Sequence, residues 1–333
     1  MAHESSCDGD LWVYLERTPQ GTLAPVSLEL LGRGRELAAE LDCGVAGVLL
    51  GCDKLEPLTK QAIAGGADTV FVATHELLAE YSTDAWTMVL DNLLGEHRPA
   101  ILLIGATFNG RDLAGRLAVR THTGLTADVV RLEIDPKTKL LLSGVPGFGG
   151  SIIAMILCPE HRPQMATVRP GIFSARDPEP RRKGDIVPVQ VELLPDKIHT
   201  TLRQRELQET IDITTADRVV ATGVGVAGRF AQWQELAEQL GAAVGATRPL
   251  ADEGIVDRAQ QIGSTGVSIK PELLICAGIS GAAHFTAGIA DAGTVVAINT
   301  DPDAPIFEHA DYCLVGDADE ILPPLLAALT EDA

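Results

Sequence analysis

The segment Arg218-Val-Val-Ala-Thr-Gly-Val-Gly-Val-Ala-Gly228 joins a short apolar run to the pattern G-x-G-x-x-G. Apolar residues at helical spacing follow over 230–240, and a second apolar run follows at 242–246. A glycine turn lets a strand pass directly into a helix, and strand, helix and strand in this order form a right-handed crossover between parallel strands. With further apolar runs at 272–277 and 294–298, the segment predicts a doubly wound α/β domain.

The N-terminal part of the chain repeats this alternation and predicts a βαβ domain with a mostly parallel sheet. Ser27 is predicted to cap the first helix, and Asn109 or Asp112 the last, although the turn before that last helix could also bind an anion. Residues 128–191 contain short apolar runs between Gly and Pro, which predict antiparallel or edge structure. The expected strands are 11–15, 45–50, 69–73 and 100–105, and the expected helices are 28–41, 58–64, 83–95 and 112–121.

A polar segment of mixed charge, residues 195–215, separates the two series of strands and helices. Linkers between domains are typically polar and exposed. We therefore predict an N-terminal α/β domain at residues 1–203 and a C-terminal domain at residues 204–333. The length of 333 residues fits two domains of ordinary size, and because only 4% of the residues are aromatic, both cores must consist mainly of aliphatic side chains.

The formal net charge of −20 disfavours nucleic acid and anionic membrane surfaces as partners, because both select for basic patches. No apolar run approaches the roughly 18 residues of a membrane span, so we expect no direct membrane insertion. The N-terminal residues 1–10 are polar and acidic and lack the pattern of a signal peptide. We therefore expect a cytoplasmic protein.

The six cysteines are scattered, without the spacing of zinc or iron–sulfur ligands, so we predict no metal site. The motifs HExxH and GxSxG and the P-loop lysine are also missing from the sequence. We therefore predict no catalytic residue for hydrolytic or covalent chemistry.

Two further glycine-rich segments point to a binding site in the C-terminal domain. Gln261-Ile-Gly-Ser-Thr-Gly266 combines backbone freedom with hydrogen-bonding side chains. Gly278-Ile-Ser-Gly-Ala282 follows an apolar run and precedes a helical pattern at 283–289, so its N–H groups and the helix dipole favour an anionic phosphate. Ligands of open α/β sheets bind at the carboxyl ends of the strands. We therefore expect one crevice, with Asn299 and Asp317 following the next two strands.

Each of these features also has an ordinary structural explanation. Gly223–Gly228 lacks the acidic residue that should follow after about 20 positions to bind a ribose, so this glycine turn could serve packing alone. Asn299 and Asp317 are residue types that often cap turns and helices. Arg248, directly after a predicted strand, could be solvated or form a weak surface ion pair.

Taken together, these segments make the chain resemble the α subunit of electron-transfer flavoproteins along nearly its whole length. The C-terminal part of the resemblance rests on 242–249, Gln261–Gly266, Gly278–Ala282, 297–307 and 310–312. The N-terminal part rests on 103–107, 110–112, 123–128 and 162–171.

The resemblance implies an extended FAD in the C-terminal domain, with its isoalloxazine ring near Arg248 and Gln261–Gly266. Thr247 and Thr265 would lie near flavin N5 and O4, and Arg248 would raise the flavin reduction potential. The ribityl-diphosphate and adenosine end would be held by Gly278–Ala282, Asn299 and Asp317. The resemblance thus implies sixteen cofactor-binding residues: Thr247, Arg248, Gln261, Ile262, Gly263, Ser264, Thr265, Gly266, Gly278, Ile279, Ser280, Gly281, Ala282, His284, Asn299 and Asp317.

The chain departs from the family pattern in four places. Thr247 replaces a usual Ser, Ser264 a usual Gln, and Val224 a common Arg. Where many members have Gln-His, this chain has His284-Phe285. The usual histidine is thought to meet flavin O2, which Phe285 cannot do. Either His284 substitutes from the neighbouring position or that interaction is missing, and the sequence is compatible with both.

The resemblance implies a heterodimer with a β subunit that covers the N-terminal domain and part of the flavin. The donor would be a dehydrogenase of the acyl-CoA type, as in fatty acid oxidation, or NADH, and the acceptor a quinone oxidoreductase or a ferredoxin-linked enzyme. A flavin-based bifurcating assembly is an alternative within the family. Outside it, the alternatives are an NAD(P)-dependent oxidoreductase that uses Gly223–Gly228 and a structural partner without flavin.

Overall fold

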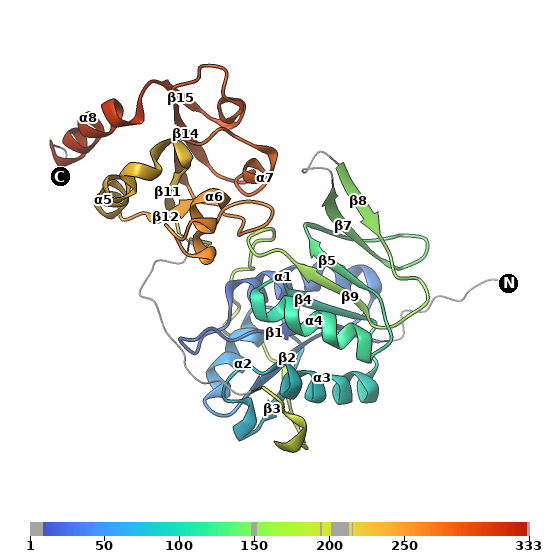
Figure 1. Cartoon of the computed structure of the whole chain (residues 1–333). Helices are drawn as coiled ribbons and strands as arrows, with labels where there is room; N and C mark the ends of the chain where they lie inside the picture. Colours follow the sequence, from blue (N-terminus) through green and yellow to red (C-terminus); the bar gives the residue numbers. More distant parts are fainter. Residues whose placement is uncertain (1–8, 148–151, 194, 201–212, 215, 332–333) are drawn as a thin grey trace. The chain divides into compact units, whose positions relative to one another are not determined.

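The computed structural model describes residues 9–147, 152–193, 195–200, 213–214 and 216–331, and these form two compact units, one before and one after residues 201–212 (Figure 1). Both units are α/β, as predicted. The predicted boundary between residues 203 and 204 lies outside the described residues and stays a prediction. Among the described residues, no helix is long and apolar enough to cross a membrane, and no group of three or more potential metal ligands occurs.

The N-terminal unit is built on a seven-stranded parallel sheet of order β10-β3-β2-β1-β4-β9-β5. Helices α1 and α2 pack on one face and α3 and α4 on the other, which gives two apolar core layers. The strands are β1 Leu11–Leu15, β2 Val45–Gly51, β3 Thr69–Thr74, β4 Ile101–Gly105, β5 Leu125–Val129, β9 Gln164–Val168 and β10 Asp185–Val189, and the helices are α1 Pro25–Leu41, α2 Leu55–Ala64, α3 Thr83–His97 and α4 Phe108–Arg120.

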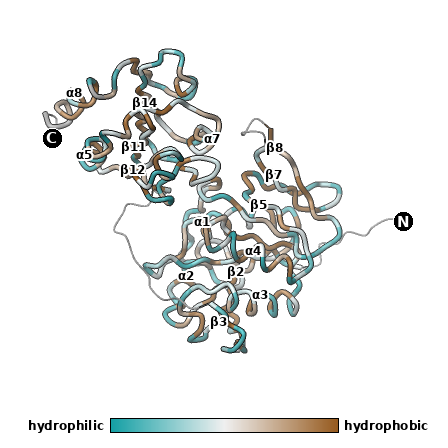
Figure 2. Tube along the Cα trace, in the orientation of Figure 1, coloured by the Kyte–Doolittle hydropathy of each residue, from teal (hydrophilic) through white to brown (hydrophobic). Residues whose placement is uncertain are grey.

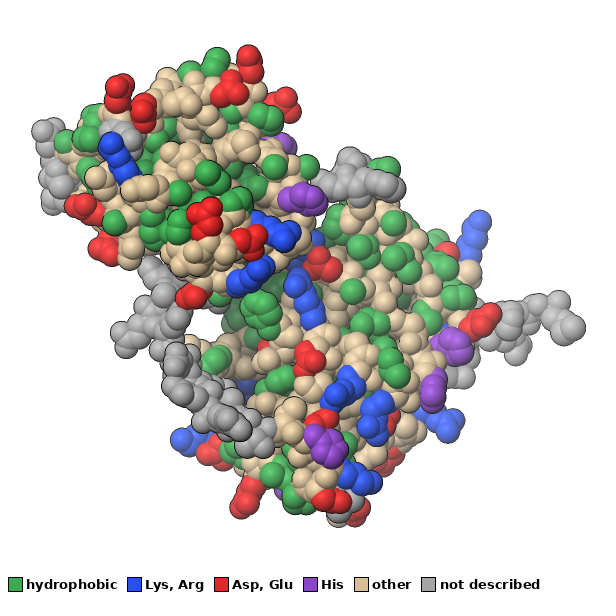
Figure 3. Space-filling view, in the orientation of Figure 1, with side chains coloured by type: hydrophobic (Ala, Val, Ile, Leu, Met, Phe, Trp, Pro, Cys, Tyr) green, Lys and Arg blue, Asp and Glu red, His purple; other side chains and the backbone are tan. Residues whose placement is uncertain are grey.

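A second sheet in this unit is antiparallel and has the order β6-β7-β8, with β6 Arg131–Ile134, β7 Leu141–Gly147 and β8 Ile152–Ile156. Figure 2 shows β8 as an apolar strand. Nevertheless, Ile152, Ile153, Met155 and Ile156 are all exposed, and hydrophobic side chains gather at the surface around β7 and β8 in Figure 3. This sheet therefore presents an apolar surface to solvent.

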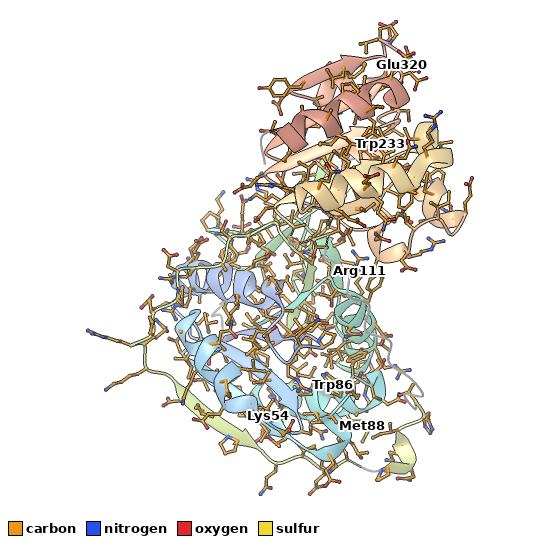
Figure 4. All side chains as sticks on the ribbon, turned by 90° about the vertical axis from the view of Figure 1, so that its left-hand side faces the viewer. Lys54, Trp86, Met88, Arg111, Trp233 and Glu320 are labelled. Carbon is orange, nitrogen blue, oxygen red and sulfur yellow. The ribbon has the colours of Figure 1, made fainter. Side chains whose placement is uncertain are left out.

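Side chains along β1 alternate between the two core layers, as expected for a parallel strand buried on both faces. Leu11 and Val13 belong to the layer beneath α1 and α2, whereas Trp12 and Tyr14 belong to the layer beneath α3 and α4. In the latter layer, the indole N–H of Trp86 on α3 donates to the Tyr14 hydroxyl at 2.9 Å (Figure 4). This bond satisfies two polar groups that would otherwise be buried without a partner.

The start of the first helix and part of the segment 128–191 differ from the expectations for the N-terminal unit. Helix α1 begins at Pro25, whose fixed φ suits the first helical turn, so Ser27 lies inside the helix and does not cap it. Residues 128–191 were expected to be antiparallel or edge structure, which is confirmed for the antiparallel strands β6, β7 and β8 and for the edge strand β10. It is wrong for β9, which runs parallel between β4 and β5 inside the main sheet. All five residues of β9 are buried. The Pro and Gly residues that flank it are typical of turns and edges, so the sequence pattern did not indicate a core strand.

Asp128 joins α4 to the edge of this sheet. Its carboxylate accepts hydrogen bonds from Arg169 at 2.5 Å and from Arg111 on α4 (Figure 4) at 3.3 Å. Burial alone would raise the pKa of Asp128, but the hydrogen bonds and charges of Arg169 and Arg111 outweigh burial and lower it. Because the pKa of Asp128 is lower in the folded chain than in the unfolded chain, its charged form stabilises the fold. This stabilisation is complete at pH values above the unfolded pKa, and it is lost as the pH falls through the folded pKa.

We therefore expect Asp128→Asn to lower the free energy of unfolding by about 2 kcal/mol at pH 7, the usual value of hydrogen bonds to a charged group. Asn tolerates the positive φ of 60° at this position, so the substitution tests the charge rather than the backbone. Urea unfolding at neutral pH and near pH 3 measures the effect, which should shrink at the lower pH. Glu56→Gln, which removes an exposed pair with Lys60, is the control and should leave the free energy of unfolding nearly unchanged at both pH values. An equal loss at both pH values would contradict the ion-pair explanation.

The C-terminal unit is a five-stranded parallel sheet of order β12-β11-β13-β14-β15. Helices α5 and α8 cover one face, where Trp233 of α5 is fully buried (Figure 4). The other face is covered mainly by loops and by α7. The strands are β11 Arg218–Thr222, β12 Ala243–Ala246, β13 Leu273–Ala277, β14 Thr294–Asn299 and β15 Tyr312–Val315, and the helices are α5 Phe230–Leu240, α6 Arg248–Asp252, α7 Ala283–Thr286 and α8 Ala318–Glu331.

Candidate functional site

A crevice lies at the carboxyl ends of β11, β12, β13 and β14. The chain passes from β11 to β12 on one side and then to β13 on the other, so the order of strands reverses here, which is where open α/β sheets bind ligands. The cavity measures about 470 Å³, within the usual range for ligand pockets. It is lined by Gly223, Val224, Gly225, Thr247, Arg248, Pro249, Ile262, Thr265, Gly278, Ile279, Ser280, Ala282, His284, Phe285 and Asn299.

Two glycine turns form the floor of this crevice by touching each other through their backbones. A Cβ atom on Gly223 would lie only 2.2 Å from the carbonyl oxygen of Gly278. The N–H of Gly225 donates to the same oxygen at 3.2 Å. Gly278 also has a φ of +60°, which L-residues rarely adopt. Only glycine at these positions lets the turns pack this closely and leave open space above them.

The turn after β13 presents a row of backbone donors. In the described part of the chain, the N–H groups of Ile279, Ser280, Gly281 and Ala282 donate to no acceptor. The side-chain amide of Asn299 donates to the carbonyl of Ile279 at 2.9 Å and so supports the turn. Successive free N–H groups in a turn form a concave site for an anion.

The helix that follows this turn is shorter than predicted. It was expected over 283–289, but α7 spans only Ala283–Thr286, and Gly288 beyond it packs tightly against Gly263. A single turn has little macrodipole, so the attraction for an anion rests on the backbone N–H groups themselves.

The segment Gln261–Gly266 forms a rigid wall of the crevice. Gln261 is buried, and its side-chain amide donates to the Thr265 hydroxyl at 2.8 Å. A Cβ atom on Gly266 would lie 2.0 Å from the carbonyl oxygen of Gln261, so the loop doubles back on itself. The amide oxygen of Gln261 has no partner among the described residues. The loop therefore presents Ile262 and Thr265 to the cavity from a fixed backbone.

The side of the crevice formed by α6 carries a positive charge. Arg248 is the first residue of α6, and its Nε donates to Asp252 at 3.1 Å. Arg258 binds the other oxygen of the same carboxylate at 2.9 Å but does not line the crevice. Because 61% of the Arg248 side chain is exposed, its guanidinium keeps donors available beyond the pair with Asp252.

The structure brings most of the predicted cofactor-binding residues into the crevice. Gln261, Gly263, Gly266 and Gly281 instead shape the loops around it. The predicted residues in the lining are Thr247, Arg248, Ile262, Thr265, Gly278, Ile279, Ser280, Ala282, His284 and Asn299, whereas Gln261, Gly263, Ser264, Gly266, Gly281 and Asp317 lie outside it. The lining residues missing from the predicted set are Gly223, Val224, Gly225, Pro249 and Phe285. The G-x-G-x-x-G pattern at Gly223–Gly228 is the sequence signal that could have identified Gly223, Val224 and Gly225 as lining residues.

The second candidate turn, between β4 and α4, already binds a carboxylate of the chain itself. Thr107 caps α4 by accepting the N–H of Gly110 at 2.9 Å, so the expected caps Asn109 and Asp112 are wrong. The Thr107 hydroxyl and the Asn109 amide donate to Glu16 at 2.6 and 3.3 Å. Burial raises the pKa of Glu16, and these two bonds oppose that rise. The two side-chain donors of this turn are therefore engaged within the fold.

Comparison with known proteins identifies both units. Residues 11–194 match the family model described as the electron transfer flavoprotein domain, and residues 212–290 match that of the electron transfer flavoprotein FAD-binding domain. The electron transfer flavoprotein subunit alpha of Thermoanaerobacterium thermosaccharolyticum is 41% identical over 95% of this chain and 96% of its own. That of Clostridium acetobutylicum is 42% identical, again over 95% and 96%.

Protein FixB of Clostridium saccharobutylicum is 41% identical over 96% of both chains. The matches cover nearly the whole chain, and they agree with the position of the crevice in the C-terminal unit. The chain therefore belongs to the electron transfer flavoprotein family, as an α subunit with a C-terminal FAD-binding domain.

Proposed function

We propose that FAD binds in extended form in the crevice at the carboxyl ends of β11 to β14. Its isoalloxazine ring would lie beside Arg248, Ile262 and Thr265, and its diphosphate would bind the backbone N–H groups of Ile279–Ala282. The observation that carries this placement is the row of free N–H groups in a turn whose glycines hold the crevice open. When bound, FAD supplies the electron-transfer chemistry, and the protein supplies position and electrostatics.

The residues of the crevice fit such a cofactor. The N–H groups at Ile279–Ala282 complement a diphosphate, which has no donors of its own. Ile262, Ile279 and Phe285 provide apolar surface against which a flat ring can pack and which excludes water from it. Thr265 and Arg248 add a hydroxyl and a charge at the ring's polar edge. The guanidinium of Arg248 would favour negative charge on the ring and so raise the reduction potential.

Membership of the family implies a β subunit as partner. We infer that this subunit covers the N-terminal unit, and the exposed apolar surface of β8 supports this placement. The side chains of this strand point alternately to its two faces. The apolar residues on both faces are between 41% and 56% exposed, namely Ile152, Ile153, Met155 and Ile156. Exposed apolar patches of this kind mark protein interfaces.

We further propose that the heterodimer takes electrons from a dehydrogenase of the acyl-CoA type or from NADH. It would pass them to a quinone oxidoreductase or to a ferredoxin-linked acceptor. A bifurcating assembly would need a second flavin in the β subunit.

The test is an absorbance spectrum, with quantification of released cofactor, on the full chain co-expressed with its β subunit. We expect a yellow complex with about one FAD per heterodimer, retained through gel filtration. Two flavins per heterodimer would indicate the bifurcating function. One FAD together with one AMP would indicate a simple electron carrier. A folded complex that binds no flavin but binds NAD(P) would overturn the proposal.

A further inference from the structure

Two walls of the crevice are joined at the pair Ser264 and His284. The N–H of Ser264 donates to the carbonyl oxygen of His284 at 2.7 Å. Their side chains also meet, with Ser264 Oγ 2.9 Å from His284 Nδ1. Gly263 allows this approach, because it has a φ of +131° and a Cβ there would lie 2.5 Å from the His284 carbonyl oxygen. Backbone and side chain thus fix the same contact.

The neighbouring residue determines which way His284 points. Phe285 is 5% exposed and packs in the core beneath α7. Because α7 is a single turn anchored by this aromatic ring, the preceding residue is turned outward, and His284 is exposed and lines the crevice. An exposed histidine would ordinarily sample several rotamers. The bond from Ser264 restricts that freedom.

The hydrogen bond engages one of the two ring nitrogens. Nδ1 faces Ser264, whereas Nε2 has no hydrogen-bond partner among the described residues. In a neutral imidazole one nitrogen donates and the other accepts, and the partner of the first decides the role of the second. A serine hydroxyl that donates to Nδ1 leaves the proton on Nε2.

We propose that Ser264 is a positioning residue: its hydroxyl donates to His284 Nδ1, so that Nε2–H is presented as a donor to a ring acceptor of the bound flavin. This inference rests on the proposed placement of FAD in the crevice. The polar edge of an isoalloxazine ring carries two carbonyl oxygens and two ring-nitrogen acceptors against one N–H donor. An Nε2–H donor therefore matches that edge better than a nitrogen lone pair does.

The proposal is tested with His284→Phe, His284→Gln, Ser264→Ala and the Ser264→Ala/His284→Phe double variant, each in the full chain with its β subunit. The dissociation constant of FAD is measured by fluorescence, and the tautomer of His284 by its side-chain ¹⁵N shifts. His284→Phe should weaken FAD binding about tenfold, the effect of one hydrogen bond. His284→Gln keeps an N–H donor at similar reach and should stay within about threefold.

Ser264→Ala should weaken binding about threefold and replace the single Nε2–H tautomer by a mixture. It should add nothing in the His284→Phe background, because the serine acts only through the histidine. His309→Phe, an exposed histidine of the same unit outside the crevice, is the matched control and should bind FAD like the unaltered chain.

Additive losses in the double variant, or a ring protonated on Nδ1, would overturn the proposal. An unchanged FAD affinity in His284→Phe would overturn it as well and would leave the FAD site itself intact. Failure of the unaltered complex to bind FAD would overturn the proposed function together with this inference, so the two failures are distinguishable.

Discussion

Ala282→Glu is expected to weaken FAD binding roughly hundredfold while leaving the chain folded. Ala282 is exposed and lines the crevice at the end of the row of free N–H groups. A carboxylate about 4 Å from one phosphate charge costs about 4 kcal/mol at an effective dielectric of about 20. Screening by salt at this exposed position reduces the cost to about 2.7 kcal/mol, which is a factor of about one hundred in the dissociation constant.

Ala290→Glu provides the matched control. Ala290 is exposed in the same segment but does not line the crevice, so the substitution adds the same charge to the same unit away from the proposed diphosphate site. FAD content after gel filtration and FAD titration of the apo complex measure both variants. The diphosphate assignment would be wrong if the two variants bound FAD equally well.

Arg248→Ala is expected to lower the one-electron reduction potential of the bound flavin by about 59 mV, the equivalent of about 1.4 kcal/mol. A full charge about 4 Å from the ring would contribute about 4 kcal/mol at an effective dielectric of about 20. The smaller value is expected because 61% of the side chain is exposed and its Nε is already paired with Asp252. Retention of FAD should weaken at the same time.

Spectroelectrochemistry of the reconstituted variant measures this potential. Arg258→Ala is the control, because Arg258 binds the same Asp252 carboxylate and lies outside the crevice. It should shift the potential by clearly less than Arg248→Ala does, since an exposed charge that does not line the crevice is more strongly screened by solvent and salt. Equal shifts in both variants would show that Arg248 acts only through the general charge of this surface.

The sequence left open whether His284 can act in place of a histidine at position 285. In the structure, Phe285 is anchored in the core and His284 lines the crevice with one ring nitrogen engaged by Ser264. The two departures at 264 and 284 are thus neighbours in space. No pattern within either segment indicates this, because 20 residues separate them along the chain.

The alternation of strands and helices, and the glycine turns at the strand ends, could be predicted from the sequence because they depend on local periodicity and local conformational preference. Both ends of β1 agree with the predicted range 11–15, and the fold class and the FAD-binding character of the C-terminal unit are confirmed. The boundary at 203 and the roles of the individual site residues stay predictions.

What only the tertiary structure decided depends on contacts between distant segments. Strand β9 lies between β4 and β5 because all of its side chains are buried in the core. The prolines and glycines that flank it indicated edge structure instead. Glu16 reaches Thr107 across 91 positions and fills a turn that resembles an anion site when considered alone. The crevice also depends on such contacts. Local sequence specified each glycine turn, but the packing of Gly223 against Gly278 determined which backbone groups face the ligand. Only folding brings these two turns together, because they are far apart in the sequence.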